Sequence, residues 1–331
     1  MNSKSINPSL FIRYASFPKQ NSLGFASNDP FALGPIFVDH CPQELVNIFP
    51  YSENVQPLYQ HKNAIWSPCN TEIKFEPWPT PKSNCFTWAN RMYIGLRDKW
   101  EYLGIADATL TSNSPIKPDL PLIVALISFW SPTSSTFVFS EGFLSPTLMD
   151  VSAMLSLPIE GIPVHHEMKC KQHCTIDIDK NHSTLGYTHF MQKYMQNFGE
   201  VITFEEETCF YLYWLYKFLI NSPSKRIITY YLSIAIALAN KHKLALAPFF
   251  LGSVYRTMFL VTIDPKDSIG GPLWFIQLWT YAHFPQLAPK PNPSIFSRST
   301  CHAYLFALSA YEPNHIPHFG DWFNLFSDKE S

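Results

Sequence analysis

Residues 120–164 restrict the possible folds of this chain most strongly, because three different local structures must follow one another there within a short distance. An apolar stretch begins after Asp119, whose side chain can cap it, and ends near Trp130, which predicts a helix. Two β-favouring triplets on either side of a Gly-containing turn predict a β-hairpin near 136–144. A second helix is expected to begin directly after Thr147. This order indicates a mainly helical protein with one small β element.

The start of the second helix carries a capping box. The Thr147 hydroxyl can accept a hydrogen bond from the backbone N–H of Asp150, and the Asp150 carboxylate can reach back to the N–H of Thr147. Gly161 is expected to turn the chain after this helix. Thr203 and Glu206 have the same spacing and predict a second capping box, with acidic side chains at the positive end of the helix dipole.

Apolar residues at helical spacing dominate the sequence from residue 85 onward, and Pro-rich turns separate them. The first such stripe contains Trp88, Met92, Leu96, Trp100 and Leu103, and Gly104 would end that helix. Further helices are expected over 187–198, from Thr203, and over 229–242, 247–261, 272–284 and 301–311. We therefore expect residues 85–331 to form a single, mainly α, multi-helix globular body.

Residues 1–84 have a different composition, rich in Pro, Asn and Ser with short aromatic islands. The segment EPWPTPK at 76–82 cannot be helical, because each proline removes a backbone donor and restricts the residue before it. We expect an irregular, Pro-rich N-terminal arm that packs on the body through its aromatic side chains and could contain one or two short strands.

The charge balance argues against a strong electrostatic nucleic-acid binder, since the formal net charge is -2 and the pI is near 6.6. Charged residues make up only 15%, against roughly 25% in average globular domains, which suggests that a partner, or segments missing from this chain, cover some apolar area. No window reaches the roughly 18 consecutive apolar residues that a transmembrane helix needs, so no membrane span is expected.

Seven cysteines, an odd number, and a first segment without a hydrophobic signal favour a reducing intracellular compartment with free thiols. Cys209 and Cys301 lie in apolar helical patterns and are expected to be buried and inert. Among nucleophile motifs, the stretch around Ser253 lacks the second glycine of a Gly-x-Ser-x-Gly elbow. The sequence offers no catalytic constellation.

One loop has zinc-like spacing of thiols and imidazoles. His166, Cys170, His173 and Cys174 follow one another at intervals of one to four residues, and a loop could wrap an ion there. The two separated Cys-x-x-Cys pairs of a structural zinc site are missing, so an ordinary polar loop is the preferred interpretation. We predict no resident metal or cofactor.

Four tryptophans and one arginine have two interpretations each. Trp130, Trp214, Trp274 and Trp279 could line a groove for a partner, but their helix-periodic apolar surroundings favour a role in the core. Arg256 is a lone charge beside an apolar run, and we predict that it forms a partly buried ion pair.

Four blocks, in this order, resemble the plant mobile domain, a module of plant transposons and of host proteins derived from them. The similarity spans roughly residues 99–285 and is carried by Trp130 with Phe137 and Phe139; by Thr147 and Asp150 with Gly161; by Tyr255 and Arg256; and by Gly271, Pro272 and Trp274 with Trp279.

The resemblance implies a non-catalytic nuclear scaffold or interaction protein, linked to transposon silencing, meristem maintenance and genome integrity or carried by a mobile element. It also implies a protein partner, in some relatives a phosphatase-like nuclear protein. Members are often labelled "aminotransferase-like", but a pyridoxal-phosphate site needs a Gly-rich phosphate cup and a Schiff-base lysine with partners. This chain has only 12 glycines, and Lys217, Lys241 and Lys243 lie in helical patterns without such partners. A metal- or cofactor-dependent enzyme is the alternative function.

Overall fold

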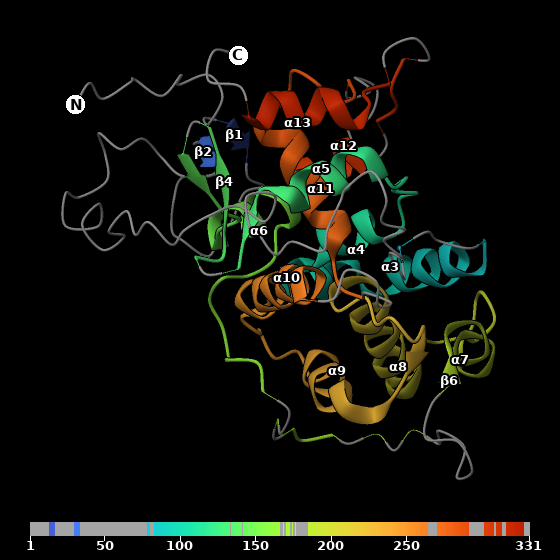
Figure 1. Cartoon of the computed structure of the whole chain (residues 1–331). Helices are drawn as coiled ribbons and strands as arrows, with labels where there is room; N and C mark the ends of the chain where they lie inside the picture. Colours follow the sequence, from blue (N-terminus) through green and yellow to red (C-terminus); the bar gives the residue numbers. More distant parts are fainter. Residues whose placement is uncertain are drawn as a thin grey trace.

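Helices predominate in the computed structural model of the chain, which confirms the expected mainly α fold (Figure 1). The structure describes residues 13–16, 30–33, 78–79, 83–132, 134–140, 142–165, 168, 170–172, 174, 176, 185–263, 270–290, 301–307, 309–312 and 316–327. No helix among these residues is both long enough and apolar enough to cross a bilayer.

The helices follow the apolar stripes of the sequence, with short connections between most of them. In chain order they are α3 (Ser83–Leu103), α4 (Ala106–Ser112), α5 (Leu120–Ser128), α6 (Leu148–Leu155), α7 (Tyr187–Tyr194), α8 (Phe204–Trp214), the π-helical turn η3 (Leu215–Leu219), the 3-10 turn η4 (Thr229–Tyr231), α9 (Leu232–Ala239), α10 (Leu246–Ile263), α11 (Leu273–His283), α12 (His302–Ala307) and α13 (Phe319–Ser327).

The strands are short and form small antiparallel sheets. They are β1 (Arg13–Ser16) paired with β2 (Pro30–Leu33); β3 (Trp130–Ser131), β4 (Thr136–Phe139) and β5 (Gly142–Leu144) in the order β3-β4-β5; and β6 (Leu185–Gly186) paired with β7 (Arg226–Ile227). Most of the proposed N-terminal arm, residues 1–84, lies outside the described residues. Within it, β1 and β2 are the kind of short strands that the sequence allowed.

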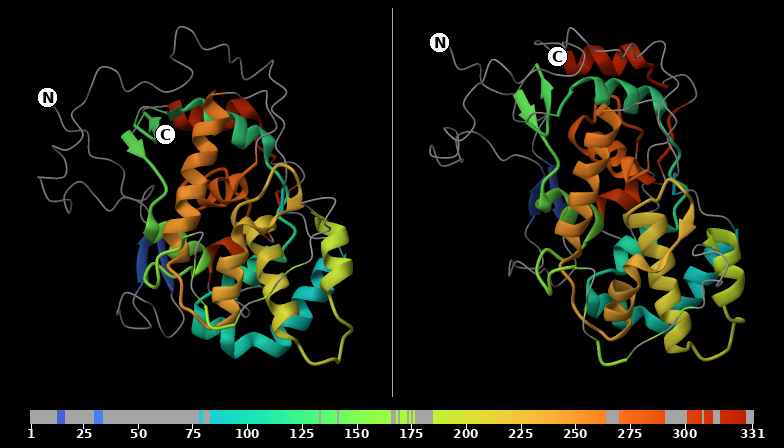
Figure 2. Two further views of the ribbon diagram at one scale, coloured as in Figure 1. Left: turned by 90° about the horizontal axis from the view of Figure 1, so that it is seen from below. Right: turned by 60° about the horizontal axis from the view of Figure 1, so that its bottom comes forward.

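The two ends of the helical body contain different helices. At one end α13 packs across α5, and at the other α8 packs against α9 with α7 beside α8 (Figures 1 and 2). Between them, α6 contacts α10 and α12, and α11 contacts α10 and α12. Segments that are distant in the sequence therefore share one core.

The region of residues 120–164 folds largely as predicted. The Asp119 side chain caps α5 by accepting from the N–H of Leu122 at 3.1 Å, and the hairpin of β4 and β5 is present. The helix ends earlier than expected, however, and Trp130 lies in strand β3, where it pairs with Phe137. The reason is local: the N–H of Val138 donates to the carbonyl of Phe129 at 2.8 Å, which extends the hairpin into a three-stranded sheet.

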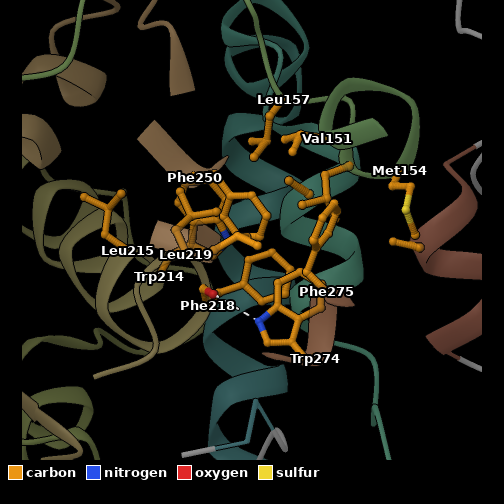
Figure 3. Close-up of a cluster of buried hydrophobic side chains, with 14 of the residues drawn as sticks. Val151, Met154, Leu157, Trp214, Leu215, Phe218, Leu219, Phe250, Trp274 and Phe275 are labelled. Carbon is orange, nitrogen blue, oxygen red and sulfur yellow. Dashed lines mark hydrogen bonds between the residues drawn. The ribbon is translucent and has the colours of Figure 1, made fainter. Parts of the chain in front are cut away.

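Aromatic side chains from several helices fill the core, as Figure 3 shows for one cluster. Trp274 stacks on Phe218 with ring centroids 4.3 Å apart, and its indole N–H donates to the carbonyl of Phe218 at 3.3 Å. Phe250 of α10 packs against Trp274, with ring centroids 5.8 Å apart. The preferred interpretation of the tryptophans as core residues is confirmed, since all four are at most 3% exposed: Trp130, Trp214, Trp274 and Trp279.

Some helix boundaries were wrong. Helix α7 ends at Tyr194 instead of Phe198, so Phe198 does not share the buried face of Phe190 and is 68% exposed. The last predicted helix, over 301–311, is confined to α12. Helices α4 and α13 were missed. Helix α4 is short with few apolar positions, whereas α13 carries an apolar stripe of Phe319, Trp322, Phe323 and Phe326 that does indicate a helix.

A buried ion pair joins α3 to α8. The Arg91 guanidinium donates to both carboxylate oxygens of Glu206, from Nε at 3.0 Å and Nη2 at 2.9 Å. The indole of Trp88 and the backbone N–H of Gln196 donate to the same carboxylate at 3.2 and 3.1 Å. With exposures of 6% and 1%, Arg91 and Glu206 satisfy each other away from water.

This pair corrects the second capping-box prediction. Thr203 does cap α8, because its hydroxyl accepts from the N–H of Glu206 at 3.1 Å. The Glu206 carboxylate, however, points to α3 instead of back to the cap. Its neighbour Glu207 is buried as well and pairs with Lys99, which also donates to the carbonyl of Ala239 at 2.7 Å. These glutamates are therefore connectors between helices as well as charges at a helix start.

The first capping box is present and extends into a buried network. Asp150 accepts from the N–H and the hydroxyl of Thr147 at 2.7 and 2.8 Å, and its own N–H donates to the Thr147 hydroxyl at 3.2 Å. His283 Nε2 lies 3.4 Å from Asp150 Oδ1, and both side chains are fully buried. Burial by itself raises the pKa of Asp150, but His283 and the two Thr147 donors outweigh it and hold that pKa below its usual value.

We predict that replacing Glu206 with Ala destabilises the protein by about 3–5 kcal/mol, because it leaves the Arg91 charge buried without a partner. The matched control is Glu101→Ala. It removes the exposed Arg97–Glu101 pair on α3, the helix of Arg91, and is expected to change stability little. Denaturant titrations of the wild type and the two variants give the change in unfolding free energy for each substitution. Equal effects of the two substitutions would contradict the structural role of Glu206.

We also predict a pH-dependent effect of Asp150→Asn. Since the folded-state pKa of Asp150 is lower than the unfolded one, its carboxylate stabilises the fold above roughly pH 4 and loses that effect as the pH falls further. The difference in unfolding free energy between the wild type and Asp150→Asn should therefore shrink below roughly pH 4. The exposed Asp98→Asn serves as control and should give a small difference at every pH. A constant difference for Asp150→Asn would refute the prediction.

Candidate functional site

The most exposed apolar side chains gather where α3 meets the loop between α7 and α8. Among the described residues, the three large apolar side chains with the greatest exposure are Val201 at 86%, Ile94 at 71% and Phe198 at 68%. Single exposed apolar residues are ordinary, but three on adjoining segments mark a surface that a partner could cover.

Two contacts hold the loop on α3. Arg91 Nη1 donates to the carbonyl of Glu200 at 2.9 Å, and the side chain of Ile202 lies directly over Gly95. A Cβ atom at Gly95 would come within 2.3 Å of Ile202 Cδ1, so this close approach requires glycine unless Ile202 moves. These contacts hold Glu200 and Ile202, which flank Val201, against the stretch of α3 that contains Ile94.

A shallow groove of about 650 Å³ lies beside the stretch of α3 that contains Ile94. Ile94 and Tyr102 line it, and the Lys243 ammonium lies 4.3 Å from the ring centroid of Tyr102. The other lining residues carry charges of both signs or have small or apolar side chains: Gly95, Leu96, Arg97, Asp98, Lys99 and Lys241. We call Ile94, Tyr102, Phe198 and Val201, together with this groove, the α3 surface.

Sequence reasoning missed the α3 surface. Phe198 was placed on the inner face of a helix that in fact ends before it. The available signal was Ile94, an apolar residue outside the buried stripe of Trp88, Met92 and Trp100 on α3. A single residue of this kind carries little weight until the fold places the loop that carries Val201 against α3.

The predicted His/Cys loop is only partly described. Cys170 and Cys174 are half-buried, and the loop is anchored by two hydrogen bonds of 3.1 Å between Gln172 and Asn240. Burial raises the pKa of both thiols, with a further increase from Glu205 at Cys174, so the protonated form is favoured over the thiolate that binds zinc. His166 and His173 lie outside the described residues. The described part of the chain contains no group of three potential ligands, and an ordinary polar loop here stays a prediction.

The remaining candidate nucleophiles are enclosed. Cys209 and Cys301 are 0% and 1% exposed. Burial raises the pKa of Cys301 to about 12 and that of Cys209 even further, which keeps both as thiols. Asp150 and His283 are likewise without exposed surface, so a substrate cannot reach them in this structure.

Several family-motif residues form one aromatic cluster beneath the small sheet. Phe137 is central to it: Trp130 packs edge-on at 4.9 Å, while Phe139 and Trp279 stack on it at 5.6 Å each. Tyr255 adds a polar contact at its margin, since its hydroxyl donates to the carbonyl of Pro146 at 2.8 Å. These motif residues therefore serve the packing of the core.

The other motif residues hold chain turns. Gly271 has a φ of +122°, and a Cβ atom there would lie 1.7 Å from the Thr257 hydroxyl, so only glycine fits before Pro272 and α11. Gly161 precedes a bridge in which the N–H of Ile162 donates to the carbonyl of Lys243 at 2.8 Å. These contacts join the end of α6 to the turn before α10.

The prediction for Arg256 was wrong. Its side chain is exposed on α10 instead of lying in a partly buried ion pair. The buried charges of the described residues belong to other positions, above all Arg91 and Glu206. An arginine in an apolar run can leave the core simply by lying on the outer face of its helix.

Comparison with known proteins places this architecture in a family. The Plant mobile domain family model matches residues 104–319, which extends beyond the expected 99–285 at its C-terminal end. Protein MAIN-LIKE 2 of Arabidopsis thaliana is 28% identical over 190 residues. That similarity covers 54% of this chain and 28% of MAIN-LIKE 2, so the match spans less than a third of the relative. No solved structure matches.

The family match covers well over half of the chain and includes every residue that carried the resemblance in the sequence. Helix α3 precedes the matched range, whereas Phe198 and Val201 of the α3 surface lie inside it. The chain belongs to the plant mobile domain family.

Proposed function

We propose that this chain is a non-catalytic nuclear interaction protein that binds a protein partner through the α3 surface. The family suggests the setting: transposon silencing, meristem maintenance and genome integrity, or carriage by a mobile element. It also suggests the partner, a phosphatase-like nuclear protein. The observation that carries the proposal is the position of Val201, Ile94 and Phe198, the three most exposed large apolar side chains of the described residues, at one junction.

The α3 surface has the anatomy of a protein interface. Its centre is apolar, and charges of both signs surround it, with Arg97 paired to Glu101 at 2.9 Å and Lys241 across the groove. Interfaces commonly combine an apolar centre with a polar rim that stays solvated. Burial of Ile94 and Val201 against a partner would remove apolar area from water, which favours association.

A protein suits this surface better than a nucleic acid. The groove presents Asp98 beside Arg97, so a phosphate backbone would meet repulsion as well as attraction. The net charge of -2 adds no long-range attraction for a polyanion. Tight, salt-dependent DNA binding by the pure protein would contradict this part of the proposal.

The burial of ionisable residues of the types that often act in catalysis supports a non-catalytic role. Asp150, His283 and Glu206 are buried at 0%, 0% and 1% exposure, and each has a partner that explains its presence. Their contacts hold helices together, so these groups serve the fold. The accessible surface of α3 instead offers apolar contact area.

We predict that Ile94→Asp and Val201→Asp each weaken partner binding by roughly tenfold or more, because a charge at the centre of an apolar contact must lose its water. The assay is affinity purification of the tagged protein from plant nuclei, followed by titration of the purified phosphatase-like partner. Wild type is expected to recover this partner, and both variants to lose it.

The matched control is Ile316→Asp. Ile316 is 56% exposed and lies before α13, at the end of the molecule away from α7 and α8. This substitution makes the same chemical change at similar exposure and should leave partner binding intact. Equal binding by all variants would remove the α3 surface from the proposal, and a cytoplasmic protein without this partner would overturn the function itself.

A further inference from the structure

Cys85, Tyr213 and Lys217 form a cluster of reactive side chains that the proposed function does not use. Lys217 Nζ donates to Cys85 Sγ at 3.2 Å and to the Tyr213 hydroxyl at 3.1 Å, and the Tyr213 oxygen lies 2.8 Å from the sulfur. Cys85 lies in the first turn of α3, whereas Tyr213 and Lys217 come from α8 and η3. Side chains distant in the sequence thus meet within hydrogen-bonding distance.

The arrangement offers the sulfur two donors. The Lys217 ammonium can only donate, and the Tyr213 oxygen already accepts one of its N–H bonds. Burial, followed by the effect of Cys85, raises the pKa of Tyr213 far above its usual value, so the phenol keeps its proton and can donate it to Sγ. The sulfur therefore lies between an ammonium donor and a phenol donor.

A small cavity adjoins the sulfur. Its volume is about 20 Å³, enough for one water-sized molecule. Cys85, Tyr213, Trp214 and Lys217 contribute to its lining, and the buried indole N–H of Trp214 has no partner among the described residues. Such a cavity can admit hydrogen peroxide and excludes a bulky thiol such as glutathione.

The backbone that carries Lys217 is irregular. Helix α8 passes at Leu215 into a π-helical turn that ends at Leu219, and Lys217 is its central residue. Single π-helical turns occur frequently at functional sites, where they redirect a side chain. Lys217 is half-buried, in contrast to its buried neighbours Tyr216 and Phe218, so the cluster lies at the edge of the core.

We propose that Cys85 is a site of reversible oxidation by hydrogen peroxide and that Lys217 captures the oxidised sulfur. In the first step the Cys85 thiol gives its proton to solvent, and the resulting thiolate attacks one peroxide oxygen. An S–O bond forms, the O–O bond breaks, and the departing hydroxide takes a proton from the Lys217 ammonium and leaves as water. Sulfur is oxidised to sulfenic acid and peroxide is reduced.

In the second step the neutral Lys217 amine attacks the sulfenic sulfur. An S–N bond forms, the S–OH bond breaks, and the hydroxide together with one amine proton leaves as a second water. The separation of 3.2 Å between nitrogen and sulfur is a near-attack distance. The product is a sulfenamide that ties the start of α3 to the π-helical turn, and a small thiol can reduce it once the protein has been digested to peptides.

The test is peptide mass spectrometry of the folded wild-type protein after brief treatment with hydrogen peroxide. We expect a linked pair of peptides containing Cys85 and Lys217, two hydrogen atoms lighter than their sum, that separates on reduction by a small thiol. A bulky maleimide should label the half-buried Cys170 before Cys85, because the cavity excludes it.

Two variants separate the steps. Lys217→Arg keeps the charge but lacks a nucleophilic amine, so the Cys85 peptide should gain oxygen without a link. Lys217→Met lacks the charge as well and should oxidise at Cys85 more slowly. Thermal melts check that both variants are folded, and the wild-type result stands without them. The proposal is wrong if wild-type Cys85 stays a thiol while Cys170 is oxidised, or if it gains oxygen without forming the link.

Discussion

The buried ion pair between Arg91 and Glu206 is the interaction on which the rest of this architecture depends. Two charges taken out of water are tolerated only when they meet in good geometry with further hydrogen bonds, and Trp88 and the N–H of Gln196 supply those bonds. Arg91 also donates to the carbonyl of Glu200. A single guanidinium therefore fixes three segments: α3, the start of α8 and the loop that carries Val201.

This constraint links the two proposed properties of the molecule. The α3 surface exists because the loop with Phe198 and Val201 is held on the outer side of α3, and the Cys85 cluster exists because the same helix pair brings Cys85 to Tyr213. One property concerns the solvent-facing side of α3 and the other its inner side, so a partner on the outer face leaves the cavity beside Cys85 free. The sulfenamide proposal is independent of the proposed partner, and either can fail alone.

The sequence predicted local structure well wherever one residue decides it. Asp119 and Thr147 cap their helices through their own neighbours, and both were foreseen from spacing. The tryptophan-rich stripes were correctly assigned to the core, since helical periodicity reflects burial. One error arose where a distant partner competes with a local one: the Glu206 carboxylate matches a capping box by spacing, but Arg91 binds it. Another concerned a helix boundary, since α7 ends at Tyr194 and leaves Phe198 exposed to solvent.

The sequence by itself determined the class of fold, the capped helices around a small hairpin and, through its motifs, the family. These properties rest on contacts between residues close in the chain or on the order of the motif blocks along it. Only the tertiary structure decided where charges and exposed apolar groups meet. Three contacts join residues more than a hundred positions apart: Arg91 with Glu206, Lys217 with Cys85 and Gly95 with Ile202. A contact between residues so far apart in the chain leaves no local pattern in the sequence.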